Sequence, residues 1–420
     1  MNKKLIRVHG PTKLQGRVEV SGSKNSALPI LAATILLDGV SSISNVPDLS
    51  DTNSILKLLC HLGLRAEFLN NNVKIFSTND TRHIAPYELI TSIRASFIVA
   101  GPVLARTGLA KIPLPGGCAI GSRPVDIHLK GFEAMGAKVK MEHGIIVIKS
   151  SHGLKGNTII LDFPSVGATE NLMMAATLAK GKTILKNVAK EPEIIDLANF
   201  LNKAGAIIQG AGTDTITIQG VDNLKSVSYE VIPDRIEAAT FILATALTRG
   251  HVEVCKLNTD HIESLLVLLA KMGVNLKVKE NHTVIVKTKR KKLKSINTTT
   301  EPYPGFPTDV QPMLMSLLNS ISGTSIIKET LFENRFMHVP EMNRMGAHIS
   351  VDARTAVIQG GVSLTGAPVK IRDLRGGAAL LMSALTAEGI TTLLGIHHLY
   401  RGYENVCSKL NALGAKIEEE

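Results

Sequence analysis

A cysteine at position 118 lies in a segment whose composition favours a reactive thiol. It follows Pro115-Gly116-Gly117 and precedes Gly121-Ser122-Arg123, so it has a flexible backbone and a cation close to it in the sequence. A nearby positive charge stabilises the thiolate, and a loop exposes it. The other three cysteines lie in predicted helices or strands: Cys60, Cys255 and Cys407. We therefore expect Cys118 to be the chemically active thiol; the alternative is an inert loop cysteine.

Polar and charged side chains recur where helices are predicted to begin. The starts of helices and the loops that lead into them carry Lys24, Asn25, Arg94, Arg123, Glu170, Asn171, Asp234, Arg235, Asp309, Arg375 and Arg401. Helix N-termini present unpaired N–H groups and a partial positive charge, so several of them together bind anions. Arginine and lysine suit phosphate and carboxylate groups. The pattern predicts a two-domain clamp over a multiply anionic substrate; the alternative is that each residue caps a helix or forms a surface ion pair.

These residues belong to a unit that repeats along the chain. A hydrophobic residue followed by glycine and a short alternating segment recurs every 68 to 73 residues, at Gly63, Gly136, Gly205, Gly273, Gly346 and Gly414. Segments that are apolar all round predict buried helices at 28–37, 172–178, 238–247 and 378–385. A second, amphipathic helix is predicted from Ile262, Leu265, Leu266, Leu269 and Met272. The glycine is expected to end this helix in a left-handed conformation, and a β-hairpin follows.

Six such units divide into two domains of three. Each domain is expected to gather its apolar helices at the centre and to place the amphipathic helices and the sheets outside, which is an α/β fold. The domains should join near Ile232-Pro233, where a proline ends a strand and the fourth unit begins.

Composition narrows the function further. The 420 residues carry a net charge of +11, which raises the possibility of a nucleic-acid partner. Six of the positive charges lie between Lys287 and Lys294, however, and such a run is expected to be a solvated loop. The chain has no tryptophan and only 4% aromatic residues, so platforms for stacking bases are not evident. A small anionic substrate is the better prediction.

Several classes of protein and site are not expected. The basic start lacks the apolar core of a signal peptide, and the longest apolar stretch, 27–37, contains Pro29 and is too short to span a bilayer. The cysteines are far apart, and none forms a Cys/His cluster with the spacing of a metal site. We therefore expect a cytoplasmic protein without membrane insertion, metal or disulfides.

Several segments of the sequence resemble those of a known enzyme family. The segment from Pro115 to Asp126 is similar to the mobile active-site loop of UDP-N-acetylglucosamine enolpyruvyl transferases. Further matching segments occur in order along the chain: 22–26, 94–96, 191–194, 233–237, 306–309, 332–337 and 373–375. The matches extend from residue 22 to residue 404.

The resemblance implies an inside-out α/β barrel fold with two domains of three repeats, residues 1–21 with 233–420 and residues 22–232, and an active site in the cleft between them. It implies transfer of the enolpyruvyl group of phosphoenolpyruvate to the 3-hydroxyl of UDP-N-acetylglucosamine, with release of phosphate, at the first committed step of peptidoglycan synthesis. The reaction needs no cofactor. A monomer is expected, without a nucleic-acid partner, and the family's loop cysteine is the target of the epoxide fosfomycin.

The resemblance also assigns roles to residues. The catalytic residues would be Cys118, which protonates or adds to phosphoenolpyruvate, Asp309, which accepts the sugar hydroxyl proton, and Lys24. Phosphoenolpyruvate would contact Lys24, Asn25, Arg94, Arg123, Arg375 and Arg401. UDP-N-acetylglucosamine would contact Asn25, Arg94, Arg123, Pro124, Val125, Asp126, Ile127, His128, Ser165, Val166, Gly167, Thr308, Asp309, Leu331 and Glu333.

Two positions depart from the family pattern. Tyr400 stands before Arg401 where an aspartate is expected, and Gly376-Gly377 follow Arg375 where Ala-Ser or Ala-Gly is commoner. A missing carboxylate beside Arg401 would affect the orientation of its guanidinium.

Among alternative functions, enolpyruvylshikimate-phosphate synthase shares the fold and the donor, but its Gly-Asn-Ala-Gly-Thr loop is absent. A non-catalytic sugar-nucleotide binder and a basic nucleic-acid-binding protein are the alternatives from other classes.

Overall fold

The computed structural model describes residues 5–77, 81–92, 94–114, 125–280, 282–288 and 293–420, with the backbone alone at 91, 92, 94 and 95. The predicted loop with Cys118, Arg123 and Pro124 therefore lies outside the described residues, as do positions 289–292 of the basic segment. The described chain divides into two compact units: unit 1 contains 5–21 and 233–420, and unit 2 lies within 22–232.

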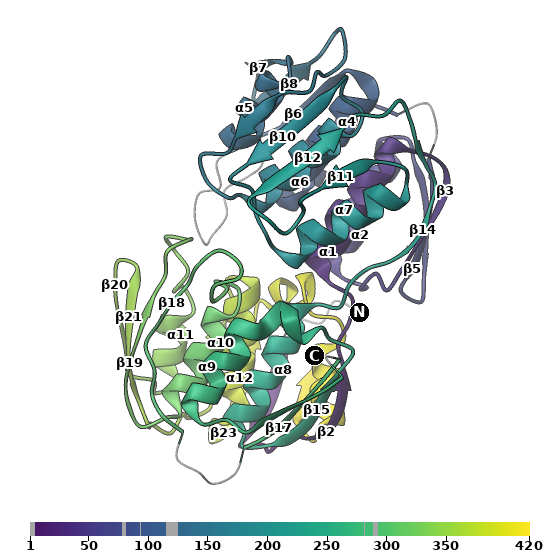
Figure 1. Cartoon of the computed structure of the whole chain (residues 1–420). Coiled ribbons are helices and arrows are strands. Elements are labelled where there is room, and N and C mark those ends of the chain that lie inside the picture. Colours follow the sequence, from purple (N-terminus) through teal and green to yellow (C-terminus); the bar gives the residue numbers. More distant parts are fainter. Residues whose placement is uncertain (1–4, 78–80, 93, 115–124, 281, 289–292) are drawn as a thin grey trace. The chain divides into compact units, whose positions relative to one another are not determined.

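Each unit is built around helices that are buried on nearly every side. In unit 1 these are α8 (Arg235–Leu247), α10 (Gln311–Asn319) and α12 (Leu374–Ala384); in unit 2 they are α1 (Lys24–Ala33), α4 (Ala100–Thr107) and α6 (Val166–Ala176). Every residue of α8 from Ile236 to Leu247 is buried. Figure 1 shows α8, α10 and α12 side by side within unit 1. The apolar segments thus form central helices, as their composition predicts. Helix α4 follows α3 (Tyr87–Ser92) and the 3-10 helix η2 (Arg94–Val99).

The predicted ends of two central helices were wrong. The apolar segment 28–37 is helical only to Ala33; the 3-10 helix η1 (Thr34–Leu36) follows, and strand β3 (Leu37–Ser44) begins at Leu37. Residues 27–37 are all buried, so one apolar run covers three elements and hydrophobicity cannot mark the boundary between them. Helix α6 likewise ends at Ala176, two residues before the predicted end.

A second helix with one exposed face follows the central helix in every segment. These outer helices are α2 (Ser50–His61), α5 (Asp126–Ala134), α7 (Pro192–Lys203), α9 (Glu263–Met272), α11 (Val339–Arg344) and α13 (Val406–Ala412). Helix α9 buries Leu265, Leu269 and Met272, with Leu266 partly buried, as the amphipathic pattern predicts; Ile262 ends the preceding 3-10 helix η3 (Thr259–Ile262). The glycine after each outer helix has a positive φ between 90° and 106°. The predicted left-handed glycines are confirmed at all six positions.

Among the described residues, each unit holds three sheets with a shared plan. A strand that follows a central helix pairs with an antiparallel strand on one edge and, in five of the six sheets, with a parallel strand on the other. In unit 1 the orders are β16 (Leu276–Lys279), β17 (Thr283–Lys287), β15 (His251–Cys255), β2 (Gln15–Glu19); β20 (Ile349–Asp352), β21 (Thr355–Gly360), β19 (Gly323–Lys328), β18 (Thr298–Thr299); and β24 (Lys416–Glu419), β1 (Leu5–Gly10), β23 (Gly389–Leu394), β22 (Pro368–Lys370).

The sheets of unit 2 follow the same plan. Their orders are β4 (Arg65–Leu69), β5 (Asn72–Ser77), β3, with β13 (Leu224–Lys225) and β14 (Ser228–Glu230) beside β3; β11 (Ile207–Gln209), β12 (Thr215–Gln219), β10 (Lys182–Lys186), β9 (Thr158–Ile160); and β7 (Lys138–Glu142), β8 (Ile145–Lys149), β6 (Leu109–Pro113). Beside β6, a single parallel bridge joins Ile84 to Lys111 in place of a strand.

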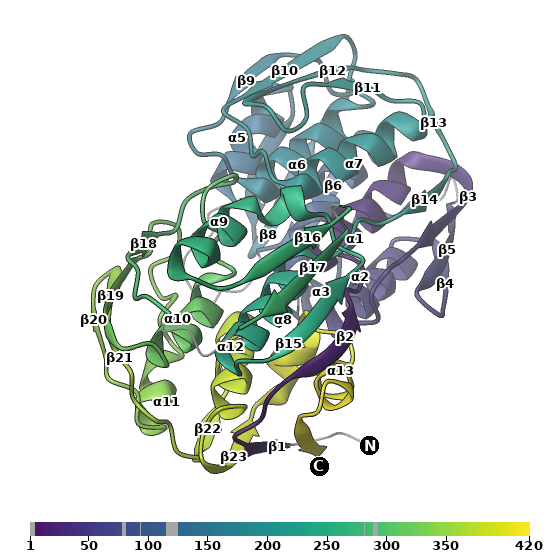
Figure 2. The same ribbon diagram turned by 60° about the horizontal axis from the view of Figure 1, so that its bottom comes forward.

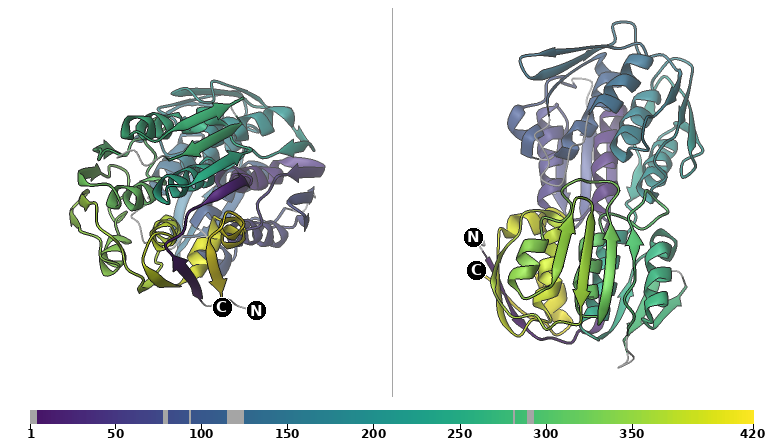
Figure 3. Two further views of the ribbon diagram at one scale, coloured as in Figure 1. Left: turned by 90° about the horizontal axis from the view of Figure 1, so that it is seen from below. Right: turned by 90° about the vertical axis from the view of Figure 1, so that its left-hand side faces the viewer.

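Three sheets take a strand from a distant part of the sequence. Strand β2 precedes α1 of unit 2 but pairs with β15 of unit 1, as Figure 2 shows, while β13 and β14 precede α8 of unit 1 but pair with β3 of unit 2. In the sheets of β9, β18 and β22 the parallel strand precedes the central helix of its own segment. Strand β1 pairs with both β23 and β24, so that the two ends of the chain share one sheet (Figure 3).

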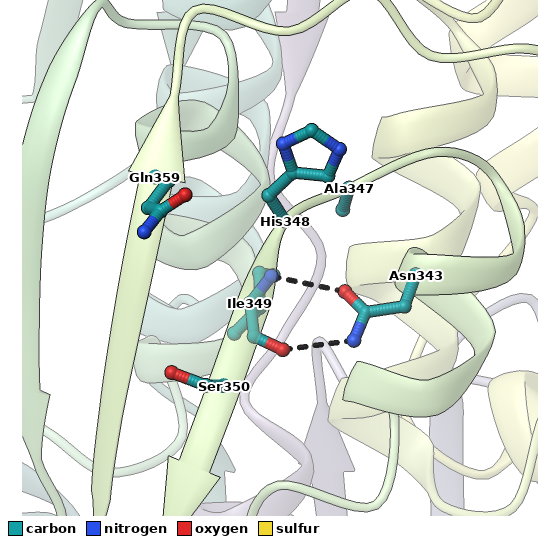
Figure 4. A pocket seen from close by; sticks show the side chains of 6 residues that line it. All are labelled: Asn343, Ala347, His348, Ile349, Ser350 and Gln359. Atoms are coloured by element: carbon teal, nitrogen blue, oxygen red, sulfur yellow. Dashed lines mark hydrogen bonds between the residues drawn. The ribbon is translucent and has the colours of Figure 1, made fainter.

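Asparagine side chains join three outer helices to the strands that follow them. The asparagine lies three residues before the glycine, at Asn202, Asn343 and Asn411, and its amide bonds the backbone N–H and C=O of an isoleucine six residues further on, at distances of 2.8 to 3.1 Å. Figure 4 shows this pair for Asn343 and Ile349, in the wall of a hollow of about 360 Å³. The bonds satisfy backbone groups that the turn would leave unpaired. No helix in the described residues has the length and apolar composition needed to cross a membrane.

Candidate active site

Asp309 forms the centre of a charged cluster in unit 1. It lies two residues before α10, and its Oδ1 accepts a hydrogen bond of 2.7 Å from Arg335 Nη2. Its Oδ2 lies 3.1 Å from both Nε and Nη2 of Arg375, a bidentate contact. The side chains of Arg335 and Arg375 are 2% and 3% exposed, whereas that of Asp309 is 28% exposed. The carboxylate is therefore the member of this cluster that a ligand can reach.

Buried charges demand partners, which explains why the two arginines converge on one carboxylate. Burial by itself would lower the pKa of Arg375, but the facing Asp309 and the nearby Tyr403 outweigh it, so the pKa is raised. The guanidinium of Arg375 lies 5.4 Å from the centre of the Tyr403 ring, and the Tyr403 hydroxyl is 2.9 Å from Thr240 Oγ1. Removing the charge of Asp309 would leave the buried guanidinium of Arg375 without its facing carboxylate, at a cost of about 3–5 kcal/mol.

An aspartate stands at or just before the start of each central helix of unit 1. Asp234 caps α8 by accepting the N–H groups of Ile236 and Glu237, and Asp373 caps α12 by accepting those of Arg375 and Gly376. Asp309, which precedes α10, receives the two guanidinium groups. These three aspartates are thus two caps and one residue suited to chemistry. Their position at helix starts does not distinguish them, although the family resemblance singles out Asp309.

Gly376 and Gly377, one of the departures from the family pattern, have a local explanation. A Cβ atom at Gly376 would lie 2.5 Å from Asp373 Oδ2 and 3.1 Å from the Cβ of His338. A Cβ atom at Gly377 would lie 2.7 Å from Ile371 Cγ2. Both glycines therefore let the cap residue and the segment before α12 pack closely against the helix.

His338 lies buried behind this cluster. Burial lowers its pKa to about 4; the charge of Arg335 adds to the shift, whereas Asp373 and a hydrogen bond to the backbone of Arg335 oppose it. The imidazole is therefore neutral at pH 7.

This gives a prediction for acid stability. The unfolded chain takes up a proton on His338 near pH 6.5, whereas the folded chain does so only near pH 4, so stability falls as the pH falls through this window. Between pH 7 and pH 5 the loss from this residue should be about 2 kcal/mol. We expect His338→Gln to lose less stability than the wild type over that interval, as measured by urea unfolding at both pH values. An equal loss in both proteins would contradict the assignment.

In unit 2, Lys24 lies in the first turn of α1, where Ser23 caps the helix. Its Nζ is 3.4 Å from Oδ2 of Asp51, a buried carboxylate in the first turn of α2. The Lys24 side chain is 13% exposed, so Asp51 holds the ammonium group near the helix N-terminus without enclosing it fully. Asn25, the next residue, is half-buried. Arg94 begins η2, and its side chain is not among those described.

His128 is held in one tautomer by Asn171. The Asn171 side chain accepts the N–H of Gly101 at 2.6 Å and donates to the carbonyl of Phe97 at 3.0 Å, which fixes the orientation of the amide. Its Nδ2 lies 3.0 Å from His128 Nδ1, which must therefore accept. Burial lowers the pKa of His128 to about 4, against the effect of Asp126. At pH 7 the ring is neutral, and it carries its proton on Nε2, a donor suited to a neutral carbonyl.

The other predicted nucleotide-side residues lie nearby in unit 2. Ser165 caps α6 by accepting the N–H of Ala168 at 3.3 Å, and Val166 and Gly167 form its first turn. A Cβ atom at Gly167 would lie 3.5 Å from Cε1 of His128, so the start of α6 and the His128 ring are neighbours. Val125 directly precedes α5, which begins with Asp126 and Ile127 and also carries His128.

The remaining predicted residues lie in unit 1 and have other partners. Glu333 faces Arg354, with 3.7 Å between Oε1 and Nη2. Arg401 ends the 3-10 helix η4 (Ile396–Arg401) and is half-buried. Tyr400 packs against the apolar core, and burial, with a contribution from the neighbouring Cys407, raises the pKa of its hydroxyl. Tyr400 thus fills core space.

Sequence reasoning assigned no role to several residues that the structure places at the site. Arg335 was part of a matching motif, but its pairing with Asp309 joins positions 26 residues apart. Asp51, which holds Lys24, looks like an ordinary helix residue in the sequence. Asn171 belongs to the polar pattern at helix starts, but its contact with His128 was not predicted. Glu329 follows a strand and belongs to no motif that the sequence analysis identified.

Comparisons with known proteins agree with this geometry. Residues 8–410 match the family of EPSP synthase (3-phosphoshikimate 1-carboxyvinyltransferase). The chain is 52% identical over 411 residues to UDP-N-acetylglucosamine 1-carboxyvinyltransferase 2 of Carboxydothermus hydrogenoformans, with 98% of each chain covered. It is 49% identical over 417 residues to the enzyme of the same name from Staphylococcus saprophyticus, with 99% of each covered.

Solved structures show the same fold. The enolpyruvyl transferase NikO from Streptomyces tendae superposes with a TM-score of 0.90 at 26% identity, covering 99% of both chains. An EPSP synthase from Acinetobacter baumannii superposes with a TM-score of 0.75 at 18% identity, covering 100% of both, which supports the fold alone. The predicted α/β fold is confirmed. By family match, sequence identity and fold together, this chain belongs to the enolpyruvyl transferases, the family of EPSP synthase and UDP-N-acetylglucosamine 1-carboxyvinyltransferase.

Proposed function

We propose that the protein transfers the enolpyruvyl group of phosphoenolpyruvate to the 3-hydroxyl of UDP-N-acetylglucosamine, with release of phosphate, as the first committed step of peptidoglycan synthesis. About half of its residues are identical to those of relatives that carry the name of this activity, over nearly the full length. The observation that carries the proposal is the partly exposed carboxylate of Asp309, which forms ion pairs with the buried guanidinium groups of Arg335 and Arg375.

The chemistry assigns a task to each group. The sugar hydroxyl oxygen bonds to C2 of phosphoenolpyruvate while its proton passes to Asp309 and a proton from Cys118 reaches the methylene carbon. Loss of a proton from that carbon and departure of phosphate then restore the double bond in the product. A carboxylate faced by two guanidinium groups is favoured in its ionised form, which a base requires.

The anionic groups of the donor would be bound by cations. Lys24, Asn25, Arg94, Arg123 and Arg401 would contact phosphoenolpyruvate, and Lys24 stands at the N-terminus of α1, where the helix dipole adds to its charge. Arg375 is buried against Asp309, so its effect on the donor would pass through the charge of the cluster. The sugar nucleotide would contact Thr308, Asp309, Leu331 and Glu333 in unit 1, and Val125 to His128 with Ser165 to Gly167 in unit 2.

The proposal extends to the architecture. The antiparallel strand order common to the six sheets, the parallel strand present in five of them and the six left-handed glycines support one ancestral unit repeated six times, three to each inside-out α/β barrel. Unit 1, with residues 1–21 and 233–420, would be the catalytic domain that carries Asp309, and unit 2 the domain that carries the Cys118 loop. The protein would act as a cytoplasmic monomer without a cofactor.

A coupled assay tests the function. We expect phosphate release from phosphoenolpyruvate only when UDP-N-acetylglucosamine is added, because the hydroxyl of the acceptor is the attacking group. Shikimate 3-phosphate, the acceptor of the related family members, should give only background release. Equal rates with both acceptors, or release with shikimate 3-phosphate alone, would transfer the assignment to the other branch of the family.

A further inference from the structure

We propose that Glu329 is a positioning residue that orients the hydroxyl of Thr308 and the backbone at Leu331 toward the acceptor sugar. The inference rests on the proposed function, since Thr308 and Leu331 are among the residues proposed to contact UDP-N-acetylglucosamine. It assigns a hydrogen-bond polarity to this part of the acceptor site: Thr308 Oγ1 accepts from the ligand.

One buried carboxylate joins two segments that are distant in sequence. Glu329 follows directly after β19 and is 0% exposed. Its Oε2 accepts the hydroxyl proton of Thr308 at 2.9 Å, and its Oε1 accepts the backbone N–H groups of Leu331 at 2.8 Å and Phe332 at 3.2 Å. The segment before α10 and the segment after β19 are thus fixed to the same group.

The sheet in turn fixes Glu329. Its backbone N–H donates to the carbonyl of Arg354 at 2.8 Å, and the N–H of the next residue, Thr330, donates to Thr300 Oγ1 at 3.0 Å. On the other side of the contact, Arg335 Nε donates to the carbonyl of Thr308 at 3.2 Å. Side chain and backbone of Thr308 are therefore both held, by Glu329 and Arg335, directly beside Asp309.

The hydrogen-bond donors around Glu329 indicate that this residue is present for the geometry of the site and not for the stability of the fold. A carboxylate taken out of water costs several kcal/mol unless strong partners compensate, and the partners here are one hydroxyl and two backbone N–H groups. In the described part of the chain, no lysine, arginine or histidine nitrogen lies within 4.0 Å of this carboxylate. An apolar residue would be cheaper to bury, so the group is better explained by the geometry that it imposes.

The carboxylate also sets the direction of the Thr308 hydroxyl. An ionised carboxylate can only accept, so the single hydroxyl proton of Thr308 is committed to Glu329. Thr308 Oγ1 then presents lone pairs, and the ligand atom that meets it must be a donor, such as an amide N–H or a sugar O–H. A ligand carbonyl at this point would leave two acceptors facing each other.

The decisive variant is Glu329→Gln. The amide oxygen can still accept from the backbone at Leu331 and Phe332, but the amide nitrogen would donate to Thr308 and free its hydroxyl proton, which reverses the polarity toward the ligand. We expect the KM for UDP-N-acetylglucosamine to rise about tenfold or more, the size of one misdirected hydrogen bond. The KM for phosphoenolpyruvate should stay within about twofold.

Two further variants separate positioning from folding. Thr308→Val removes the hydroxyl, and adding Glu329→Gln to it should change the KM for the acceptor by less than about twofold, because the coupling between the two side chains is gone. Glu341→Gln is the control for loss of a buried carboxylate charge in unit 1. Glu341 accepts a backbone N–H from Lys370 at 3.3 Å and faces Arg344 and Arg372, but it lies on α11. Its KM values should equal those of the wild type.

The outcomes are distinct. If Glu329→Gln keeps the wild-type KM for the acceptor, or lowers kcat with both KM values unchanged, Glu329 is only structural and the inference is wrong. Independent, additive effects of Glu329→Gln and Thr308→Val would also overturn it. If the wild-type protein neither releases phosphate with UDP-N-acetylglucosamine nor binds it in calorimetry, the proposed function fails first and this inference fails with it.

Discussion

Replacing Asp309 by asparagine is expected to lower kcat about a thousandfold, the middle of the range for losing a general base together with its charge. The amide cannot take the hydroxyl proton of the acceptor. Its nitrogen would also point a donor at Arg335 or Arg375, both of which are buried donors. The transition state would then lose the base, and the site would lose the negative charge that keeps two guanidinium groups in place.

The measurement is steady-state phosphate release at saturating concentrations of both substrates. Because a buried arginine would lose its partner, stability should fall as well, and kcat must be corrected for the folded fraction by urea unfolding. Asp352→Asn is a suitable control, since Asp352 is an exposed carboxylate on β20 of the same unit. A corrected kcat within tenfold of the wild type would rule out Asp309 as the base.

Local features of the fold could be predicted because they depend on neighbours in the sequence. The stripe from Leu265 to Met272 and the glycine at 273 follow from helix periodicity and from the low cost of a positive φ at glycine. The end of α1 at Ala33 could not be predicted, since apolar burial continues through η1 into β3. The pairing of β2 with β15 does not follow from local patterns, because it joins residue 15 to residue 251; only the family resemblance placed residues 1–21 with 233–420.

The candidate site could likewise be predicted only as far as it depends on residue type and local position. Residue types at helix starts indicated anion binding, and the family resemblance singled out Asp309 and Arg375. The sequence does not indicate that Arg375 forms an ion pair with Asp309, 66 residues away, or that Asn171 fixes the tautomer of His128. These contacts depend on how helices and strands that are distant in sequence pack against one another. A single sequence carries little information about that packing.

Fosfomycin is expected to inactivate the enzyme completely, with one molecule bound per chain at Cys118. The epoxide carbon is opened by a thiolate, and the loop sequence around Cys118 supplies bare backbone and the nearby Arg123. The other cysteines provide an internal comparison. Cys60 on α2 is exposed and free, whereas Cys255 and Cys407 are buried. If exposure alone decided reactivity, Cys60 would be labelled at a comparable rate.

Mass spectrometry of the digested adduct decides the matter. Cys60→Ser should be inactivated at the wild-type rate, because inactivation is expected to proceed through Cys118 alone. Cys118→Ser should resist inactivation, since a serine hydroxyl is a far weaker nucleophile than a thiolate. Phosphoenolpyruvate should slow the labelling if Cys118 lies beside the donor, as its proposed role as proton donor demands. Label on Cys60, Cys255 or Cys407 with loss of activity would place the reactive thiol elsewhere, and labelling of Cys118 that phosphoenolpyruvate leaves unchanged would separate this cysteine from the chemistry.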